Sequence, residues 1–147
     1  MTCKVAGRTL KDEDVQGIGG MVMGAVPIVS VVCAKSFGTT RPLGGFFVRK
    51  EAKGHGTNRL IDGNIHRGMR VILVDDVTTT GSSVLRAVRA ARDSGCIVHK
   101  VISVVDRCQG AGQALEDEGV PLISIFSLAD FDSSCASDSV KRNVAAG

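Results

Sequence analysis

Residues 71–83 read VILVDDVTTTGSS, and this stretch decides the fold of the chain. Residues 69–74 form a short apolar run rich in β-branched side chains, which predicts a buried strand that stops at two aspartates. Ser82 or Ser83 can cap a following helix that continues to about Ser94, where a glycine stops it. The stretch therefore predicts a strand, a turn rich in hydroxyl groups and a helix in direct succession.

The turn in this stretch has the chemistry of a phosphate-binding site. At the start of a helix, free backbone N–H groups and the positive end of the helix dipole face an anion, and nearby hydroxyl groups add donors. Gly81 leaves the backbone accessible, while Asp75 and Asp76 can bind ribose hydroxyls or orient hydrated Mg²⁺ indirectly. The alternative is an ordinary helix cap beside two solvated aspartates. We favour the binding site because the hydroxyls follow both a buried strand and an acidic pair.

The rest of the chain alternates predicted strands and helices around this segment. Strands are expected at residues 15–18, 45–48, 97–105 and 122–126, and helices from 25 to near 38 and at 111–118. The first strand is expected to end in a glycine turn at Gly19-Gly20. Such alternation predicts an α/β domain with a parallel sheet and helices on both faces. We expect one domain over residues 1–132 and a polar C-terminal tail at 133–147.

Charge is concentrated in one part of the chain. The net charge is +3, and residues 49–59 hold four basic residues and one acidic residue, so the remaining chain carries 14 of each sign. This excess predicts a local anion site. It does not indicate nucleic-acid binding, because there is neither an extended basic surface nor an aromatic platform beyond five phenylalanines.

The sequence also lacks the features of several other protein classes. There is no GxxxxGK[ST] motif for a triphosphate and no complete GxGxxG motif for a dinucleotide. No stretch of 18 apolar residues can span a membrane, and no signal-peptide pattern opens the chain. The five cysteines are scattered, which predicts reduced thiols. We therefore expect a cytoplasmic protein with neither nucleic acid nor membrane as a partner.

Two motifs resemble those of a known enzyme family. An apolar strand, two acids and a TTGS turn into a helix resemble the signature of type I phosphoribosyltransferases, whose substrate is phosphoribosyl pyrophosphate. The segment FFVRKEAKGHGTNRLIDG at residues 46–63 resembles the catalytic loop of orotate phosphoribosyltransferases. The likeness runs from about Asp14 to Phe131 and includes GGMVMGAVPI at 19–28 and VDR at 105–107. It implies transfer of ribose 5-phosphate to orotate in pyrimidine nucleotide synthesis, giving orotidine 5-phosphate and pyrophosphate.

The resemblance also implies a role for individual residues. Pyrophosphate would be bound by Arg49, Lys50, Lys53 and His55, and the ribose hydroxyls by Asp75 and Asp76. The 5-phosphate would be bound by Thr78, Thr79, Thr80, Gly81, Ser82 and Ser83, and orotate by Thr79 and Arg107. Val77 is also implied as a substrate-binding residue. The catalytic residues implied are Lys53, His55, Asp75 and Asp76. The implied cofactor is Mg²⁺, bound mainly through the substrate, and the implied assembly is a homodimer that shares the loop at residues 50–60 between subunits.

Some alternatives stay open at this point. Members of the family usually have a longer N-terminal region, so we expect a hood over the base that is reduced or absent. A non-catalytic or regulatory protein that binds phosphoribosyl pyrophosphate is one alternative, and a phosphoribosyltransferase for another base is a second. Arg107 can instead be a structural partner of Asp106, and His55 can be an ordinary surface histidine.

Overall fold

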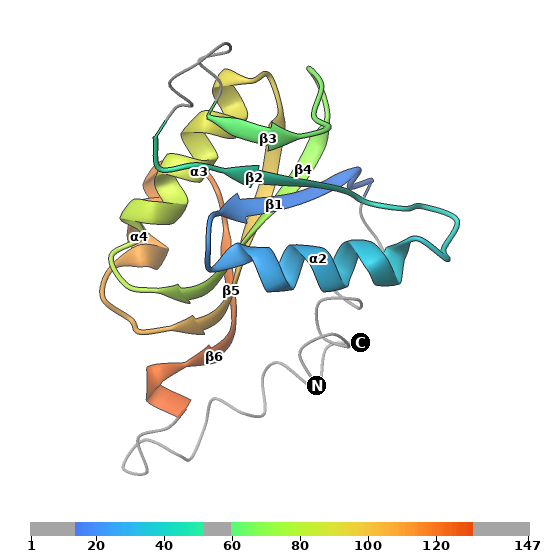
Figure 1. The fold of residues 1–147 in the computed structure, drawn as a ribbon. Helices are drawn as coiled ribbons and strands as arrows, with labels where there is room; N and C mark the ends of the chain where they lie inside the picture. Colours follow the sequence, from blue (N-terminus) through green and yellow to red (C-terminus); the bar gives the residue numbers. More distant parts are fainter. Residues whose placement is uncertain (1–13, 52–59, 131–147) are drawn as a thin grey trace.

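The computed structural model describes residues 14–51 and 60–130, which form a six-stranded sheet with helices on both faces (Figure 1). The strands are β1 Gly17–Met21, β2 Gly44–Val48, β3 Ile61–Gly63, β4 Arg70–Thr78, β5 Ile97–Asp106 and β6 Leu122–Ser127. The helices are α2 Ala25–Ser36, α3 Ser82–Asp93 and α4 Ala111–Asp117, followed by the 3₁₀ helix η1 at Leu128–Asp130. The predicted α/β fold with helices on both faces is confirmed.

The strand order determines where a ligand can bind. The order is β3-β2-β1-β4-β5-β6, and every neighbouring pair is parallel except β2 and β3. From β1 the chain continues to β2 on one side, and from β4 it continues to β5 on the other, so the order reverses between β1 and β4. Ligands of open parallel sheets bind at such a switch point, outside the carboxyl ends of the strands. The paired register of β1 and β4 ends at Gly19 and Leu73.

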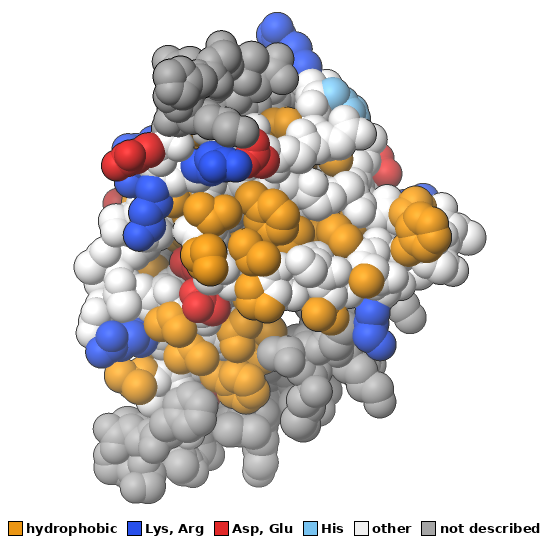
Figure 2. Space-filling model, viewed as in Figure 1, with side chains coloured by type: hydrophobic (Ala, Val, Ile, Leu, Met, Phe, Trp, Pro, Cys, Tyr) orange, Lys and Arg blue, Asp and Glu red, His pale blue; other side chains and the backbone are white. Residues whose placement is uncertain are grey.

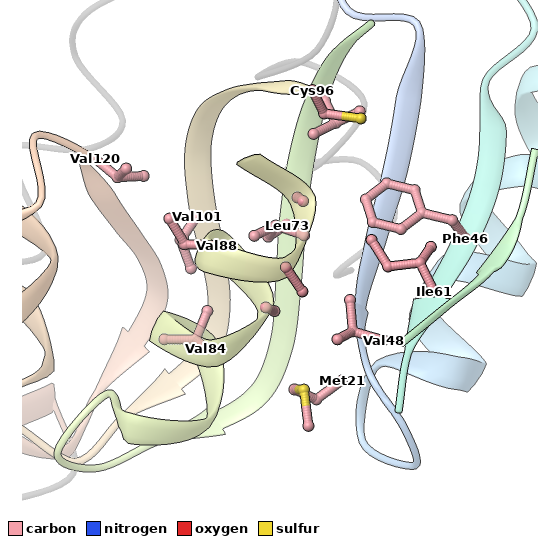
Figure 3. Packing of buried hydrophobic residues seen from close by; sticks show 14 of the residues in the cluster. Met21, Phe46, Val48, Ile61, Leu73, Val84, Val88, Cys96, Val101 and Val120 are labelled. Carbon is pink, nitrogen blue, oxygen red and sulfur yellow. The ribbon is translucent and has the colours of Figure 1, made fainter. Parts of the chain in front are cut away.

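The pleat of β4 divides the core into two layers. Val71 and Leu73 point toward α3 and α4, where they pack with Phe46 in the larger cluster of buried side chains (Figure 3). Ile72 and Val74 point to the other face and pack in the cluster that α2 covers. Because side chains alternate along a strand, the residues that follow Val74 continue these two layers.

β1 and β4 each end several residues later than the sequence indicated. β1 runs through Gly19 and Gly20, so the expected glycine turn at this point is wrong. A Cβ at Gly19 would overlap the ring of Phe46, and one at Gly20 would overlap the carbonyl group of Val74. These glycines therefore permit close packing within the sheet. β4 continues past the two aspartates to Thr78 because it stays paired with β5.

The edge strand β3 was not predicted, and it makes the sheet mixed rather than wholly parallel. It is three residues long and pairs antiparallel with β2, so that Gly63 lies opposite Phe46. A strand this short gives no alternating pattern, and its formation depends on the β2 edge beside it.

None of the helices in residues 14–51 and 60–130 is long and apolar enough to cross a membrane.

Candidate active site

The chain turns from β4 into α3 and leaves the start of this helix open. Gly81 is the N-cap residue, with a φ of 83° in the left-handed region that favours glycine. No side chain caps the helix, its first turn contains no acidic residue, and both Ser82 and Ser83 are exposed. The first backbone N–H groups of a helix have no partner within it and lie at its positive end. This arrangement is suited to binding a phosphate group.

The start of helix α4 contacts the same turn. The Ala111 N–H donates a hydrogen bond to the Thr79 carbonyl oxygen at 3.1 Å. A Cβ at Gly81 would lie 3.1 Å from the Cα of Ala111, so a larger residue at position 81 would press against α4. Thr80 is exposed, and its hydroxyl lies 3.5 Å from that of Ser82. The turn is therefore held in place while its hydroxyl groups stay accessible.

Asp75 lies in the core layer that faces α3 and is only 8% exposed. Its pKa is raised from 3.8 to about 6, first by burial and then by the neighbouring charge of Asp76. Its Oδ1 accepts a hydrogen bond from the Asp76 N–H at 3.2 Å. A buried carboxyl that changes charge near neutral pH is a common feature of functional sites.

Asp76 points toward the α2 side and is exposed. Its Oδ1 accepts the Val77 N–H at 2.8 Å, and a Cβ at Gly24 would overlap its carboxylate. The loop after β1 therefore comes close to β4 across the switch point. A cavity of about 510 Å³ opens on this side, lined by Gly24, Asp76, Val77 and apolar residues of α2, β4 and β5. The corresponding face exposes many apolar side chains (Figure 2).

Arg107 follows β5 directly and lies next to the turn. Its N–H donates to the Thr78 carbonyl oxygen at 2.9 Å, and its side chain is exposed. The Oδ1 of Asp106 is bonded elsewhere, to the Thr78 hydroxyl at 3.3 Å and the Cys108 N–H at 3.0 Å. Among the ion pairs of the described residues there is none between Arg107 and Asp106. In the described residues Asp106 is thus bonded to Thr78 and Cys108 rather than paired with Arg107, and the exposed Arg107 side chain stays a candidate for ligand binding.

Thr78 differs from the other hydroxyl residues of the turn. It is 2% exposed, and its hydroxyl points inward to Ser103 and Asp106. Its side chain is thus committed within the protein, whereas those of Thr80, Ser82 and Ser83 are exposed. The sequence gives no sign of this difference, because Thr78, Thr79 and Thr80 are chemically identical neighbours.

Arg49 and Lys50 follow β2 and have partners that the sequence analysis did not identify. The Arg49 guanidinium forms an ion pair with Asp62 of β3. Arg86 of α3 donates a hydrogen bond to the main-chain oxygen of Lys50, which connects the end of β2 to α3. The charge of Asp62 is visible in the sequence, but its partner depends on the formation of β3. Lys53 and His55, which are expected at pyrophosphate, lie outside the described residues.

The donor atoms at the switch point suit a magnesium ion carried by a substrate. Within residues 14–51 and 60–130, no three His, Cys, Asp or Glu side chains are grouped to hold a metal ion. Asp75 and Asp76 offer two adjacent carboxylates. Mg²⁺ typically binds one or two protein carboxylates together with substrate phosphates and water, so this pair fits it.

Comparison with curated proteins identifies close relatives. The orotate phosphoribosyltransferase of Methanothermobacter thermautotrophicus is 46% identical over 121 residues, which cover 82% of this chain and 64% of the relative. The orotate phosphoribosyltransferase of Aquifex aeolicus is 43% identical over 121 residues, which cover 82% of this chain and 66% of the relative. The chain thus spans just under two thirds of the length of these relatives.

Solved structures show the same fold. The orotate phosphoribosyltransferase of Mycobacterium tuberculosis H37Rv in complex with Fe(III) dicitrate superposes with a TM-score of 0.75 at 41% identity, covering 88% of this chain and 72% of that one. The same enzyme in complex with 5-phospho-α-D-ribosyl 1-diphosphate superposes with a TM-score of 0.73 at 39% identity, covering 86% and 71%. Residues 20–129 match the model of the phosphoribosyl transferase domain. From the strand order, the open start of α3 and these matches together, the chain belongs to the phosphoribosyl transferase domain family.

Proposed function

We propose that this chain transfers ribose 5-phosphate from phosphoribosyl pyrophosphate to orotate, giving orotidine 5-phosphate and pyrophosphate. One observation carries the proposal: Asp75 and Asp76 near the end of β4, the open start of α3 and the main chain of Arg107 meet at one turn, and no described residue forms an ion pair with the exposed Arg107 side chain. A sugar phosphate needs acceptors for its hydroxyls and N–H donors for its phosphate, while orotate needs a cation for its carboxylate. The curated relatives at 43% and 46% identity are orotate phosphoribosyltransferases, which supports the same reaction.

The 5-phosphate is assigned to the start of α3. Backbone N–H groups from Thr79 to Ser83 and the exposed hydroxyls of Thr80, Ser82 and Ser83 are available as donors. Thr78 contributes through its main chain, since its hydroxyl is bonded inside the protein. Gly81 keeps this backbone free of side-chain atoms, which lets the phosphate approach.

The reaction breaks the bond between the anomeric carbon and pyrophosphate and forms a bond from that carbon to N1 of orotate. Asp75 and Asp76 accept hydrogen bonds from the ribose 2- and 3-hydroxyls and so orient the anomeric carbon. Negative charge builds up on the departing pyrophosphate, and cations directed at it lower the barrier. When bound, Mg²⁺ supplies further stabilisation of this charge.

The cations proposed for pyrophosphate are Arg49, Lys50, Lys53 and His55. Arg49 is paired with Asp62 in the free protein, with about half of each side chain exposed at 41% and 51%. An exposed pair of this kind contributes up to about 1 kcal/mol, so pyrophosphate can displace the Asp62 carboxylate. Arg86 holds the main chain at Lys50 against α3, and this places the end of β2 beside the phosphate turn.

Arg107 and Thr79 are proposed to recognise the base. The guanidinium of Arg107 is planar and can bind the orotate carboxylate through two parallel hydrogen bonds. Uracil has no such group, so Arg107 would make the enzyme select the carboxylated ring. Thr79 is partly buried at the start of the same turn, where it can contact the base or the ribose.

We extend the proposal to the setting of the enzyme. It acts in pyrimidine nucleotide synthesis in the cytoplasm, as a homodimer in which residues 50–60 are shared between subunits. One catalytic domain comprises residues 1–132, followed by a tail at 133–147. Sedimentation of the full chain tests the dimer, and mixing a Lys53→Ala variant with an Arg107→Gln variant tests the shared loop. Recovery of activity in the mixture is expected if each subunit completes the site of the other.

The activity itself is tested by following the loss of orotate absorbance with the full chain, phosphoribosyl pyrophosphate and Mg²⁺. The Arg107→Gln variant is expected to lower kcat/KM for orotate by about 10- to 150-fold, which corresponds to the free energy of a hydrogen bond to a charged group. Its calorimetric affinity for phosphoribosyl pyrophosphate should be unchanged. Arg41→Gln is the matched control, because Arg41 is exposed and its ion-pair partner Asp14 is exposed as well.

The outcomes separate the proposal from its alternatives. Turnover of a purine base with none of orotate would contradict the base assignment and leave a phosphoribosyltransferase. Tight binding of phosphoribosyl pyrophosphate without turnover of any base would make the chain a non-catalytic binding protein. No binding of the sugar phosphate at all would contradict the assignment of the α3 turn.

A further inference from the structure

A buried polar network lies directly beneath the phosphate turn. Thr78 and Ser103 are 2% and 0% exposed, and their hydroxyl oxygens are 3.1 Å apart. Ser103 uses its own hydrogen to donate to the Val105 carbonyl oxygen at 2.9 Å. Thr78 therefore donates its single hydrogen, shared between Ser103 and the Asp106 Oδ1 at 3.3 Å. Each hydroxyl is satisfied, and the carboxylate of Asp106 receives a donor from β4.

The same carboxylate organises the chain just beyond β5. Its Oδ1 also accepts the Cys108 N–H at 3.0 Å, which closes a tight turn around Arg107. Cys108 has a φ of 55°, in the left-handed region that residues other than glycine adopt infrequently. The Arg107 N–H donates to the Thr78 carbonyl oxygen at 2.9 Å. The main chain of Arg107 is thus held on one side by Thr78 and on the other by Asp106.

A role in strand pairing does not account for this network. β4 and β5 are already paired through their main chains as far as Thr78 and Asp106. Apolar side chains at positions 78 and 103 would continue the buried core of both strands without burying polar groups. The distinctive consequence of the network is the direction in which Arg107 leaves the sheet relative to the phosphate turn.

We propose that Asp106 and Thr78 are positioning residues that hold Arg107 at a set distance from the phosphate turn, and that this distance determines selectivity for a carboxylated pyrimidine. The proposal rests on the proposed function, since it takes Arg107 as the partner of the orotate carboxylate. Arginine has a long side chain, and a bidentate bond to a carboxylate needs its planar group correctly placed. Loss of the Asp106 carboxylate frees the turn at Cys108 and lets the guanidinium move away from the base.

Binding of two nucleotides separates positioning from mere support of the fold. Orotidine 5-phosphate and uridine 5-phosphate share the ribose phosphate, and only the first carries the carboxylate. Asp106→Ala is expected to weaken calorimetric affinity for orotidine 5-phosphate by about 10- to 100-fold, as expected for loss of a hydrogen bond to a charged group. Affinity for uridine 5-phosphate should stay within about twofold, because the α3 turn that binds its phosphate is unchanged.

Two conservative variants and one control complete the test. Asp106→Asn keeps the Oδ1 acceptor for Cys108 and Thr78 and is expected to restore most of the preference for orotidine 5-phosphate. Thr78→Val keeps the branched shape, removes the hydroxyl donor and should produce a smaller loss of the same kind. Asp117→Ala is the matched control, since Asp117 is exposed at the end of α4 and bonds only to Gln113 among the described residues.

The results that overturn the inference differ from those that overturn the proposed function. Equal weakening of both nucleotides in Asp106→Ala would show that the network only supports the fold. An unchanged preference in Asp106→Ala would show that Arg107 is positioned without it. A wild-type protein that prefers orotidine 5-phosphate yet turns over no orotate would contradict the proposed function alone. A wild-type protein with no preference would contradict the role of Arg107 and the inference together.

Discussion

Replacement of Asp75 by asparagine is expected to stabilise the free protein while weakening its binding of phosphoribosyl pyrophosphate. Asp75 is 8% exposed, and its pKa is raised from 3.8 to about 6. At 1.36 kcal/mol for each pKa unit, ionisation of this carboxyl destabilises the folded protein by about 3 kcal/mol. Asparagine has nearly the same shape, has no charge to bury, and keeps an Oδ1 for the Asp76 N–H.

The effect of Asp75 ionisation on the free energy of unfolding depends on pH. The folded pKa of Asp75 lies above the unfolded value, so between about pH 4 and 6 the folded protein keeps a proton that the unfolded chain has lost. The stability of the wild type therefore falls as the pH rises through this window, by about 1.4 kcal/mol from pH 5 to pH 8. Asp75→Asn lacks this titration. Its advantage over the wild type is expected to grow from about 1.6 kcal/mol at pH 5 to about 3 kcal/mol at pH 8.

Urea and thermal unfolding at pH 5 and pH 8 measure this difference. For a protein of this size, the expected rise in Tm at pH 8 is about 6 to 12 °C. Asp93→Asn makes the same chemical change on an exposed carboxylate at the end of α3 and should show no comparable gain. An advantage of Asp75→Asn that stays constant between pH 5 and pH 8, or a variant less stable than the wild type at pH 8, would refute the reasoning that burial opposes ionisation of Asp75.

Three further changes and one control variant test the turn, the core and the end of β2. Gly81→Ala should lower the free energy of unfolding by about 1–2 kcal/mol, because the φ of Gly81 is 83°. Gly112→Ala in α4, where a Cβ meets open space, should raise the free energy of unfolding by about 0.5–1 kcal/mol. Urea unfolding measures both variants, and equal effects would contradict the argument from the backbone angle of Gly81. Leu73→Ala removes a fully buried side chain and should lower the free energy of unfolding by about 2–5 kcal/mol, measured in the same way. Arg86→Met removes the hydrogen bond to the Lys50 carbonyl and should raise the KM for phosphoribosyl pyrophosphate; the cost in stability is about 1 kcal/mol. An unchanged KM would mean that this contact does not place the end of β2.

Much of the site was predictable from the sequence because its signals are local. The apolar run before Asp75 and the turn into a helix after it follow from rules that involve neighbouring residues. The expected cap at Ser82 or Ser83 is wrong, because the N-cap residue is Gly81 and no side chain caps the helix. Residues 45–48 and 97–105 were recognised as strands in the same way, and the structure extends each by one residue. The order of these elements then placed the carboxyl ends of β2, β4 and β5 at one edge of the sheet.

Features that depend on distant contacts were not predictable. Gly19 and Gly20 have the composition of a turn, but they lie inside β1, paired with β2, at positions where Phe46 and Val74 leave no room for a Cβ. Asp62 became the partner of Arg49 only through the formation of β3. Nothing in the run of three threonines indicates that the hydroxyl of Thr78 points inward.

The sequence by itself determined which chemistry is present: the hydroxyl-rich turn before α3, the acidic pair and the basic segment that follows β2. The tertiary structure alone decided how that chemistry is arranged. It buried Asp75 so that its pKa rises to about 6, and it bonded Asp106 to Thr78 and Cys108, so that among the described residues no ion pair joins Asp106 to Arg107. The physical reason is that local propensity acts between neighbours in the chain, whereas burial and hydrogen-bond partners are set by residues that meet only when the sheet has formed.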